Sequence, residues 1–129
     1  MPKDIYSQLK KDFDEIGYPN GMGYYIGDGT EDIFIVYLPY DDDVTGRAED
    51  EITQLTNRLK VDIIARGGAS FSEAEKKIKK TFKEKGYIYK NGEMDVDTQE
   101  PYNYHRILYY DINYYFDDLE DIKKKKKRR

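Results

Sequence analysis

Residues 55–64 read LTNRLKVDII, and this stretch decides the fold because its apolar and polar side chains alternate. In an extended chain, successive side chains point to opposite faces, so strict alternation predicts a strand with one buried face. The expected buried side chains are those of Leu55, Leu59, Val61 and Ile63, and the expected exposed ones are those of Thr56, Arg58, Lys60 and Asp62. The pattern therefore predicts a long strand with one buried face.

Two further strands are expected before this one. Residues 33–38, IFIVYL, are apolar at nearly every position, which predicts a central strand covered on both faces. Residues 22–26 predict a strand joined to it in a hairpin, because residues 27–29 read Gly-Asp-Gly and have turn chemistry.

Two strands are expected after it. Residues 87–90 predict a short strand that ends at a turn, because Asn91-Gly92 is a strong turn signal. A loop over 95–101 then leads to a last long strand over 102–116. The side chains expected on one face of that strand are those of Tyr104, Arg106, Leu108, Tyr110, Ile112, Tyr114 and Phe116.

Two helices complete the pattern. Residues 3–16 place apolar side chains such as Leu9 and Phe13 on one helix face, and Gly17 predicts the end of that helix. The second helix is expected to begin with a capping box of Ser70 and Glu73 and to end at Gly86. Its five lysines are expected to form a solvated face: Lys76, Lys77, Lys79, Lys80 and Lys83.

The element order predicts a single α+β domain over residues 1–116. Its mostly antiparallel sheet of four to five strands carries two helices on one face. Residues 117–129 form a charged C-terminal extension, in which acids precede bases as a helix dipole favours, so the extension is compatible with a short C-terminal helix.

The extension divides the charge sharply. Its last seven residues are all cationic, which leaves 15 of the 22 Lys and Arg residues in the other 122 positions against 26 Asp and Glu. We expect this basic end to bind a protein surface, with DNA as the second choice. Its residues are Lys123, Lys124, Lys125, Lys126, Lys127, Arg128 and Arg129.

An acidic segment is the second candidate for partner binding. Residues 39–48 are polar and contain Asp41, Asp42 and Asp43, and Pro39 and Gly46 predict an exposed loop. Carboxylates here, or Asp28, Glu31 and Asp32, could hold a hard cation, but neither segment has EF-hand spacing. A solvated acidic loop is the preferred interpretation, and no metal or cofactor is expected.

No pattern indicates catalysis. The single histidine, His105, lies within a predicted strand without an orienting acid or a nucleophile nearby in the sequence. There is no cysteine, and the glycine turns lack the spacing of a phosphate-binding loop. No apolar run is long enough to cross a bilayer, so no membrane contact is expected.

Several segments together resemble the tail-terminator, or tail-completion and head–tail joining, proteins of siphophages of Gram-positive bacteria. The resemblance covers about residues 4–116 and is carried by the order and lengths of individually generic segments. These are DIYSQLKK, YYIG, FIVYLPYDDD, NRLKVDIIAR, FSEAEKKIKKTFKEKGYIY and YHRILYYDINYYF.

The resemblance implies a virion structural protein without enzyme activity. Such proteins form a hexameric ring that caps the tail tube and joins it to the head connector, or stopper, protein. DNA passes through the ring lumen without specific binding, and the protein is assembled into the phage neck in the host cytoplasm. The acidic loop over residues 40–50, which includes Asp41–Asp43, and the strand edges would then make the subunit contacts, and the basic end would bind an acidic surface on a neighbour or on the tube. Two alternatives stay open: an acidic inhibitor that mimics nucleic acid and blocks a host defence enzyme, and an enzyme of unrecognised type.

Overall fold

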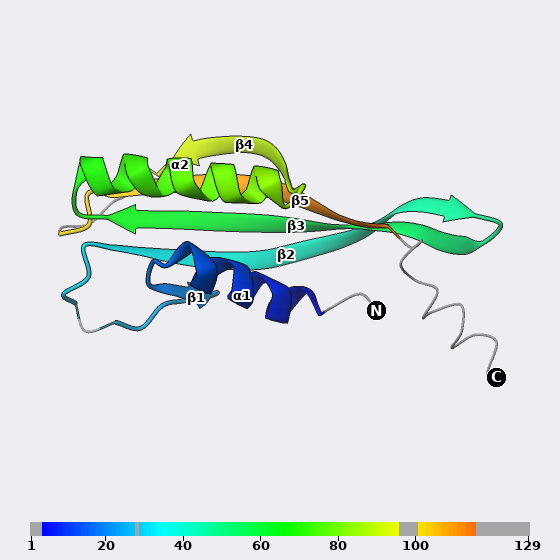
Figure 1. The fold of residues 1–129 in the computed structure, drawn as a ribbon, viewed down its shortest axis with the longest axis horizontal. Helices are drawn as coiled ribbons and strands as arrows, with labels where there is room; N and C mark the ends of the chain where they lie inside the picture. Colours follow the sequence, from blue (N-terminus) through cyan, green and yellow to red (C-terminus); the bar gives the residue numbers. More distant parts are fainter. Residues whose placement is uncertain (1–3, 28, 96–100, 116–129) are drawn as a thin grey trace.

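The computed structural model describes residues 4–27, 29–95 and 101–115, apart from the side chain of Tyr115. These residues form two helices and one five-stranded mixed sheet of strand order β1-β2-β3-β5-β4, so the predicted α+β class is confirmed (Figure 1). The elements are α1 Ile5–Ile16, β1 Asn20–Met22, β2 Ile33–Ala48, β3 Glu51–Ala65, α2 Gly68–Glu84, β4 Ile88–Met94 and β5 Tyr104–Tyr115. The predicted C-terminal helix lies outside the described residues.

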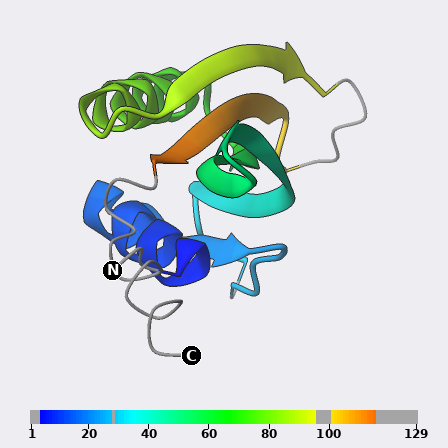
Figure 2. The ribbon, with the colours of Figure 1, turned by 90° about the vertical axis from the view of Figure 1, so that its right-hand side faces the viewer.

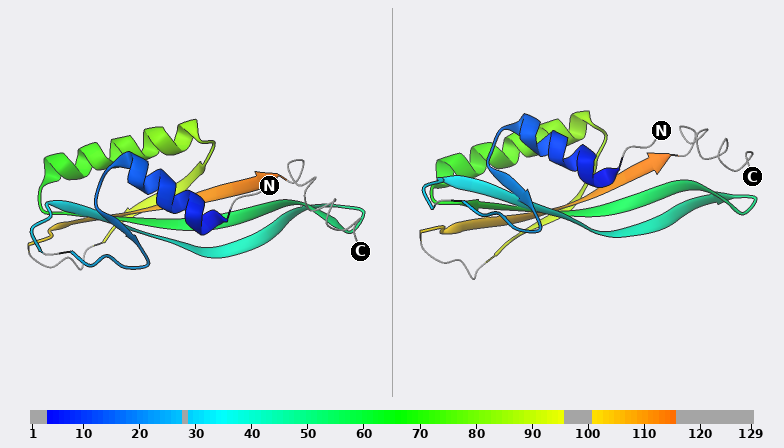
Figure 3. Two further views of the ribbon diagram at one scale, coloured as in Figure 1. Left: turned by 60° about the horizontal axis from the view of Figure 1, so that its bottom comes forward. Right: turned by 90° about the horizontal axis from the view of Figure 1, so that it is seen from below.

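Both helices pack on the same face of the sheet, as predicted (Figures 2 and 3). Val61 on the central strand β3 is paired with Tyr37 of β2 and Leu108 of β5, and all three side chains are buried. Phe13 of α1 stacks on Tyr37, with 4.2 Å between the ring centroids, and meets Phe82 of α2 edge-on at 5.4 Å. The alternation along β3 therefore supplies the sheet side of the core.

The sequence predicted the first helix closely and the second less so. Helix α1 begins after Asp4, whose carboxylate accepts from the amide of Tyr6, and ends at Gly17 with a φ of 95°. The capping box at Ser70 is wrong, because α2 begins earlier, at Gly68, without a side-chain cap. Gly86, with a φ of 80°, follows the end of α2 as predicted.

The predicted hairpin over residues 22–38 is wrong. Strand β1 is only three residues long and pairs with β2 in parallel, so the chain must cross back over residues 23–32 instead of turning tightly. Tyr25, in this connection, stacks on Phe34 with 5.1 Å between centroids. Strand β2 alternates between buried and half-buried side chains up to Leu38, which is exposed, so it is not covered on both faces.

The predicted turn at Asn91-Gly92 is also wrong, because β4 runs through it to Met94. The register with β5 shifts between Tyr89 and Asn91, which marks a bulge. A β-carbon at Gly92 would lie 2.6 Å from the Tyr89 hydroxyl and 2.7 Å from the Arg106 guanidinium. The glycine is thus needed for close approach of side chains and not for turning.

A buried polar network joins the two helices to β4. Asp12 of α1 is fully buried and accepts hydrogen bonds from Gln8 Nε2 at 2.8 Å and from the hydroxyl of Tyr87, which precedes β4. Lys85, just after α2, places its Nζ 3.1 Å from the same carboxylate. Burial, and then the bond to Asp12, raise the pKa of Tyr87.

Candidate interaction surface

The most prominent surface feature is the outer part of the β2–β3 hairpin, residues 41–58, here named the arm. It projects beyond the helices along the long axis of the molecule (Figure 1). The predicted loop over residues 39–48 is therefore wrong: β2 continues to Ala48, which pairs with Glu51 across a two-residue turn. The polar sequence predicted a loop because this part of the strand lies beyond the core. No apolar face is required there, so the alternation that indicates a strand is missing.

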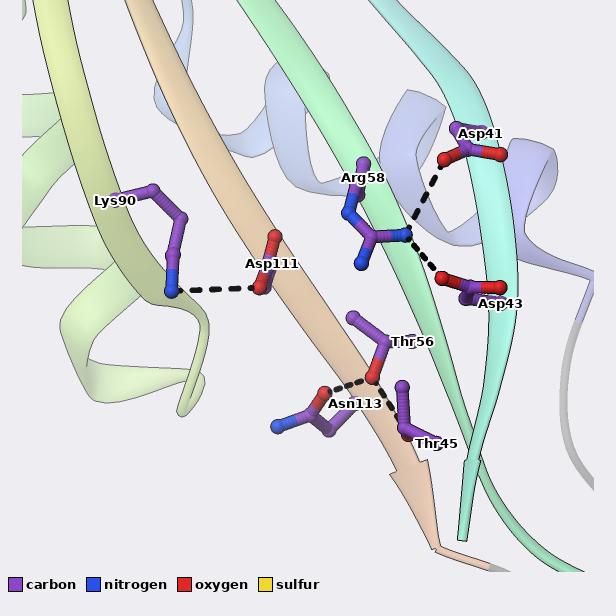
Figure 4. Close-up of polar contacts among 8 residues, drawn as sticks. All are labelled: Asp41, Asp43, Thr45, Thr56, Arg58, Lys90, Asp111 and Asn113. Carbon is purple, nitrogen blue, oxygen red and sulfur yellow. Dashed lines mark hydrogen bonds and ion pairs between the residues drawn. The ribbon is translucent and has the colours of Figure 1, made fainter.

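The three candidate aspartates lie on this strand and on both of its faces. Asp41 and Asp43 point to the face of the sheet opposite the helices and flank Arg58 of β3 (Figure 4). Arg58 Nη1 lies 3.2 Å from Asp41 Oδ2 and 3.1 Å from Asp43 Oδ2. Asp42 pairs with Asn57, so it belongs to the other face. The three residues do not form one acidic cluster, and two of them share one arginine, which offsets one of their two charges.

A register shift between Pro39 and Asp41 starts the arm. The extra residue is Tyr40, whose ring meets that of Tyr109 edge-on, with 6.4 Å between centroids. Proline has no amide proton to donate to a ladder, so a bulge on this strand is a position that tolerates it. The shift places the aspartates that follow opposite Arg58.

Beside this bulge, the uncovered sheet face has an open hollow of about 490 Å³. Its lining residues are Tyr40, Arg58, Lys90, Asn91, Glu93, Tyr109 and Asp111. Lys90 Nζ lies 3.8 Å from Asp111 Oδ2 (Figure 4), and the Tyr109 hydroxyl donates to Glu93 at 2.9 Å. That bond, with desolvation and the Glu93 charge, raises the pKa of Tyr109. The charges of the hollow are thus compensated within the chain.

A short polar chain crosses the base of the arm. Thr56 is only 3% exposed although its position in the alternation predicted exposure, and its hydroxyl donates to Asn113 Oδ1 at 2.6 Å. The hydroxyl of Thr45 lies 2.9 Å from that of Thr56, so the chain joins β2, β3 and β5 (Figure 4). No local pattern in the sequence indicates this contact, because the three residues come from three strands.

His105 lies between two carboxylates. Its Nε2 is 3.1 Å from Asp62 Oδ1 and its Nδ1 is 3.1 Å from Asp95 Oδ2. Both ring nitrogens are therefore in contact with carboxylates of the described residues. This geometry favours the predicted structural role for His105 over that of a general base.

The helix α2 presents the expected solvated lysine face. Lys76, Lys77, Lys80 and Lys83 are exposed. Lys77 lies over the Tyr18 ring, 5.6 Å from its centroid. Lys79 forms an ion pair with Glu75 of the same helix at 2.7 Å and lies over the Tyr89 ring of β4, 4.8 Å from its centroid. The face therefore includes cations that no carboxylate of the described residues neutralises.

The remaining predicted positions give no site. Asp28 and the basic end, residues 123–129, lie outside the described residues, and Glu31 accepts from the Tyr25 hydroxyl. Within the described ranges, no group of three or more His, Cys, Asp or Glu residues could hold a metal ion. No helix in the same part of the chain is long and apolar enough to cross a membrane.

Comparison with known proteins adds no relative. No family model matches the chain, and no curated protein matches it.

Proposed function

We propose that this chain is a structural protein of a phage tail that caps the tail tube as a ring and joins it to the head connector. The observation that supports this proposal best is the arm, which projects from a helix-covered sheet (Figure 3). Residues 54–58 of the arm pair with β5, and beyond Gln54 the described residues place only β2 and β3 in it. In a closed ring each subunit contacts one neighbour through one surface and the other neighbour through a different surface.

The chemistry of the arm suits binding to protein. It combines exposed carboxylates with exposed apolar side chains, since Val44 is 37% exposed and Ile52 is 39% exposed. Protein–protein interfaces combine a partly apolar centre with a charged rim in this way. The compensated charges of the neighbouring hollow also favour a structural face over one that binds a charged substrate.

The overall charge suits a ring through which DNA passes. The formal net charge of the whole chain is −4, and the residues before the basic end are far more acidic than that. Like charge opposes adhesion of the phosphate backbone to the lumen. The basic end, residues 123–129, is assigned to an acidic protein surface of the tube or of a neighbouring subunit.

The test is native mass spectrometry of the full-length protein, alone and with purified tail tubes, combined with electron microscopy of the tube ends. A hexamer, either free or formed on tube ends, is expected. A protein that stays monomeric and never associates with tubes would overturn the proposal. Removal of residues 123–129 is expected to weaken association with tubes and to leave the thermal unfolding midpoint unchanged.

The acidic inhibitor receives less support as an alternative. Mimicry of nucleic acid needs carboxylates that are free to replace phosphates, whereas Asp41 and Asp43 share ion pairs with Arg58. Its test is inhibition of nucleic-acid enzymes by the wild-type protein. Inhibition that is lost in D41N/D42N/D43N would replace the ring proposal with this one.

A further inference from the structure

The turn of the arm carries three carboxylates that no described residue neutralises. Glu49, Asp50 and Glu51 are consecutive and exposed, and they lie at the far end of the projection (Figure 1). Two residue steps of extended chain span at most about 7 Å, so the three negative charges are close together. Ile52 follows directly and adds an exposed apolar side chain.

The lysine face of α2 offers the matching charges. Lys76, Lys80 and Lys83 follow the i, i+4, i+7 spacing of one helix stripe, which spans about 10 Å along the axis. All three are exposed, and none forms an ion pair with a described residue. Three cations without an ion pair to a described residue thus occupy a stripe of about 10 Å, along which the carboxylates, which span at most about 7 Å, can lie.

We propose that the acidic turn of one copy docks on the Lys76–Lys80–Lys83 stripe of a second copy. The proposal rests on the proposed ring only in requiring a second copy of the chain. It specifies which two surfaces of neighbouring subunits are in contact in the ring: the arm tip of one subunit and the exposed face of α2 of the next. Because these surfaces differ, the contact is heterologous, as a cyclic assembly requires.

The same contact cannot form within one chain. Phe82, near the end of α2, packs on Tyr110 with 4.9 Å between centroids, and Tyr110 is paired with Leu59. Glu51 lies eight residues before Leu59 along β3, a distance of about 26 Å at the rise of a strand. The arm also points away from α2 along the long axis (Figures 1 and 3).

The open edges of the sheet favour this mode over strand addition. Beyond β1, the outer edge of β2 contains Pro39, three consecutive aspartates and several register shifts. The opposite edge, β4, has a bulge at Lys90. Prolines, charges and bulges are the features that prevent two edges from pairing. A second copy is therefore expected to bind to the helix face and not to pair its strands with an edge of the sheet.

The experiment is a charge-swap complementation with full-length protein. The arm variant is E49K/E51K, the helix variant is K76E/K83E, and the matched control is K10E/K11E on α1. Circular dichroism and thermal melting first establish that all three are folded. Native mass spectrometry and sedimentation, with tail tubes present if the wild type needs them, then measure assembly of each variant alone and of an equimolar mixture.

Each reversal alone is expected to weaken self-association at least tenfold, whereas the control assembles like the wild type. The mixture is expected to restore assembly, with arm and helix variants in equal numbers, because each reversed surface meets its complement on the other variant. Wild-type assembly by the single reversals, or failure of the mixture, would overturn the inference.

The two proposals fail in different ways. If the wild type forms rings on tubes but the swap does not restore assembly, the ring stands and this contact is wrong. If the swap restores assembly but the wild type gives open chains that ignore tube ends, the contact stands and the tail function is wrong. A wild-type protein that is monomeric under every condition, including in the presence of tubes, would contradict both proposals.

Discussion

The Thr56 hydroxyl on β3 donates to Asn113 Oδ1 on β5 at 2.6 Å, at the position where the arm leaves the body of the domain. Thr45 extends the contact to β2. Only three strands in register bring these side chains together, and Thr56 is almost fully buried. We infer that it fixes the direction of the arm relative to the sheet.

Thr56→Val tests that role. The substitution keeps the shape but leaves Asn113 Oδ1 without its donor. Because Asn113 is only part-buried and Thr45 is exposed, the expected loss of unfolding free energy is about 1 kcal/mol. Urea denaturation measures the loss. Thr53→Val, at an exposed position of the same strand, is the control and is expected to change stability by less than about 0.5 kcal/mol. Equal effects of the two substitutions would show that the polar chain is not important.

Asp12→Asn tests the buried network between α1, α2 and β4. It removes the charge that Lys85 and Tyr87 share. Because Asp12 is buried but Lys85 is not, the expected loss is that of hydrogen bonds to a charged group, about 1.5–3 kcal/mol. Lys85 keeps a contact with Glu15 at 3.5 Å. Asp14→Asn, at an exposed ion pair with Lys10, is the matched control and should cost under about 1 kcal/mol. Chemical denaturation measures both, and equal losses would contradict the assigned role of Asp12.

The sequence predicted the parts of the fold that periodicity determines. The alternation from Leu59 to Ile63 predicts the strand β3 and its buried face, and the 3.6-residue spacing of Leu9 and Phe13 predicts α1, because burial imposes one period on each element. The arm was missed for the converse reason: residues 41–48 lie beyond the core, so their strand has no apolar period to reveal it.

The candidate surface was predicted only in part. Residues 41–43 were correctly chosen as surface residues, but their division between two faces depends on the bulge at Tyr40, which no local pattern encodes. The contact of Asp41 and Asp43 with Arg58 spans 15 to 17 positions of sequence and depends on that register. The sequence did not predict the parallel pairing of β1. The Gly-Asp-Gly segment indicates a turn, but a turn signal does not determine whether the strands around it pair in parallel or antiparallel.

Buried tyrosines predict loss of stability at high pH. Burial, with the nearby charges of Asp12 and Asp4, raises the pKa of Tyr114 from 10.0 to about 12. The neutral phenol is favoured in the folded state, so this stabilisation is complete below pH 10.0 and is lost as pH rises through the folded value. Tyr87 and Tyr110 are shifted in the same direction, mainly by burial. Tyrosinate absorbance and circular dichroism are therefore expected to change together during alkaline unfolding.

Tyr114→Phe separates this effect from general alkaline denaturation. The Tyr114 hydroxyl is buried without a hydrogen-bond partner among the described residues, so its removal is expected to be neutral or stabilising at neutral pH. Unfolding of the variant should then shift to higher pH. Tyr24→Phe, at a side chain that is 69% exposed, is the control and should not shift it. A midpoint equal to that of the wild type in the Tyr114 variant would contradict the linkage.

The turn of the arm is strained, and relieving the strain gives a last prediction. Glu49 and Asp50 have φ values of 51° and 67°, the left-handed region that a two-residue hairpin turn of this hand requires. Asn-Gly adopts these angles more readily, and a side chain in this region costs about 1–2 kcal/mol per residue. E49N/D50G is thus expected to stabilise the domain by about 1–2 kcal/mol in urea denaturation. Arg47→Gly, in the paired strand before the turn, should instead destabilise it by about 0.5–1 kcal/mol. The same variant also tests the charge of the arm tip. E49N/D50G removes two of its three carboxylates, so it should weaken self-association while the fold becomes more stable. A variant that gains both stability and assembly would show that rigidity of the arm, and not its charge, limits the contact.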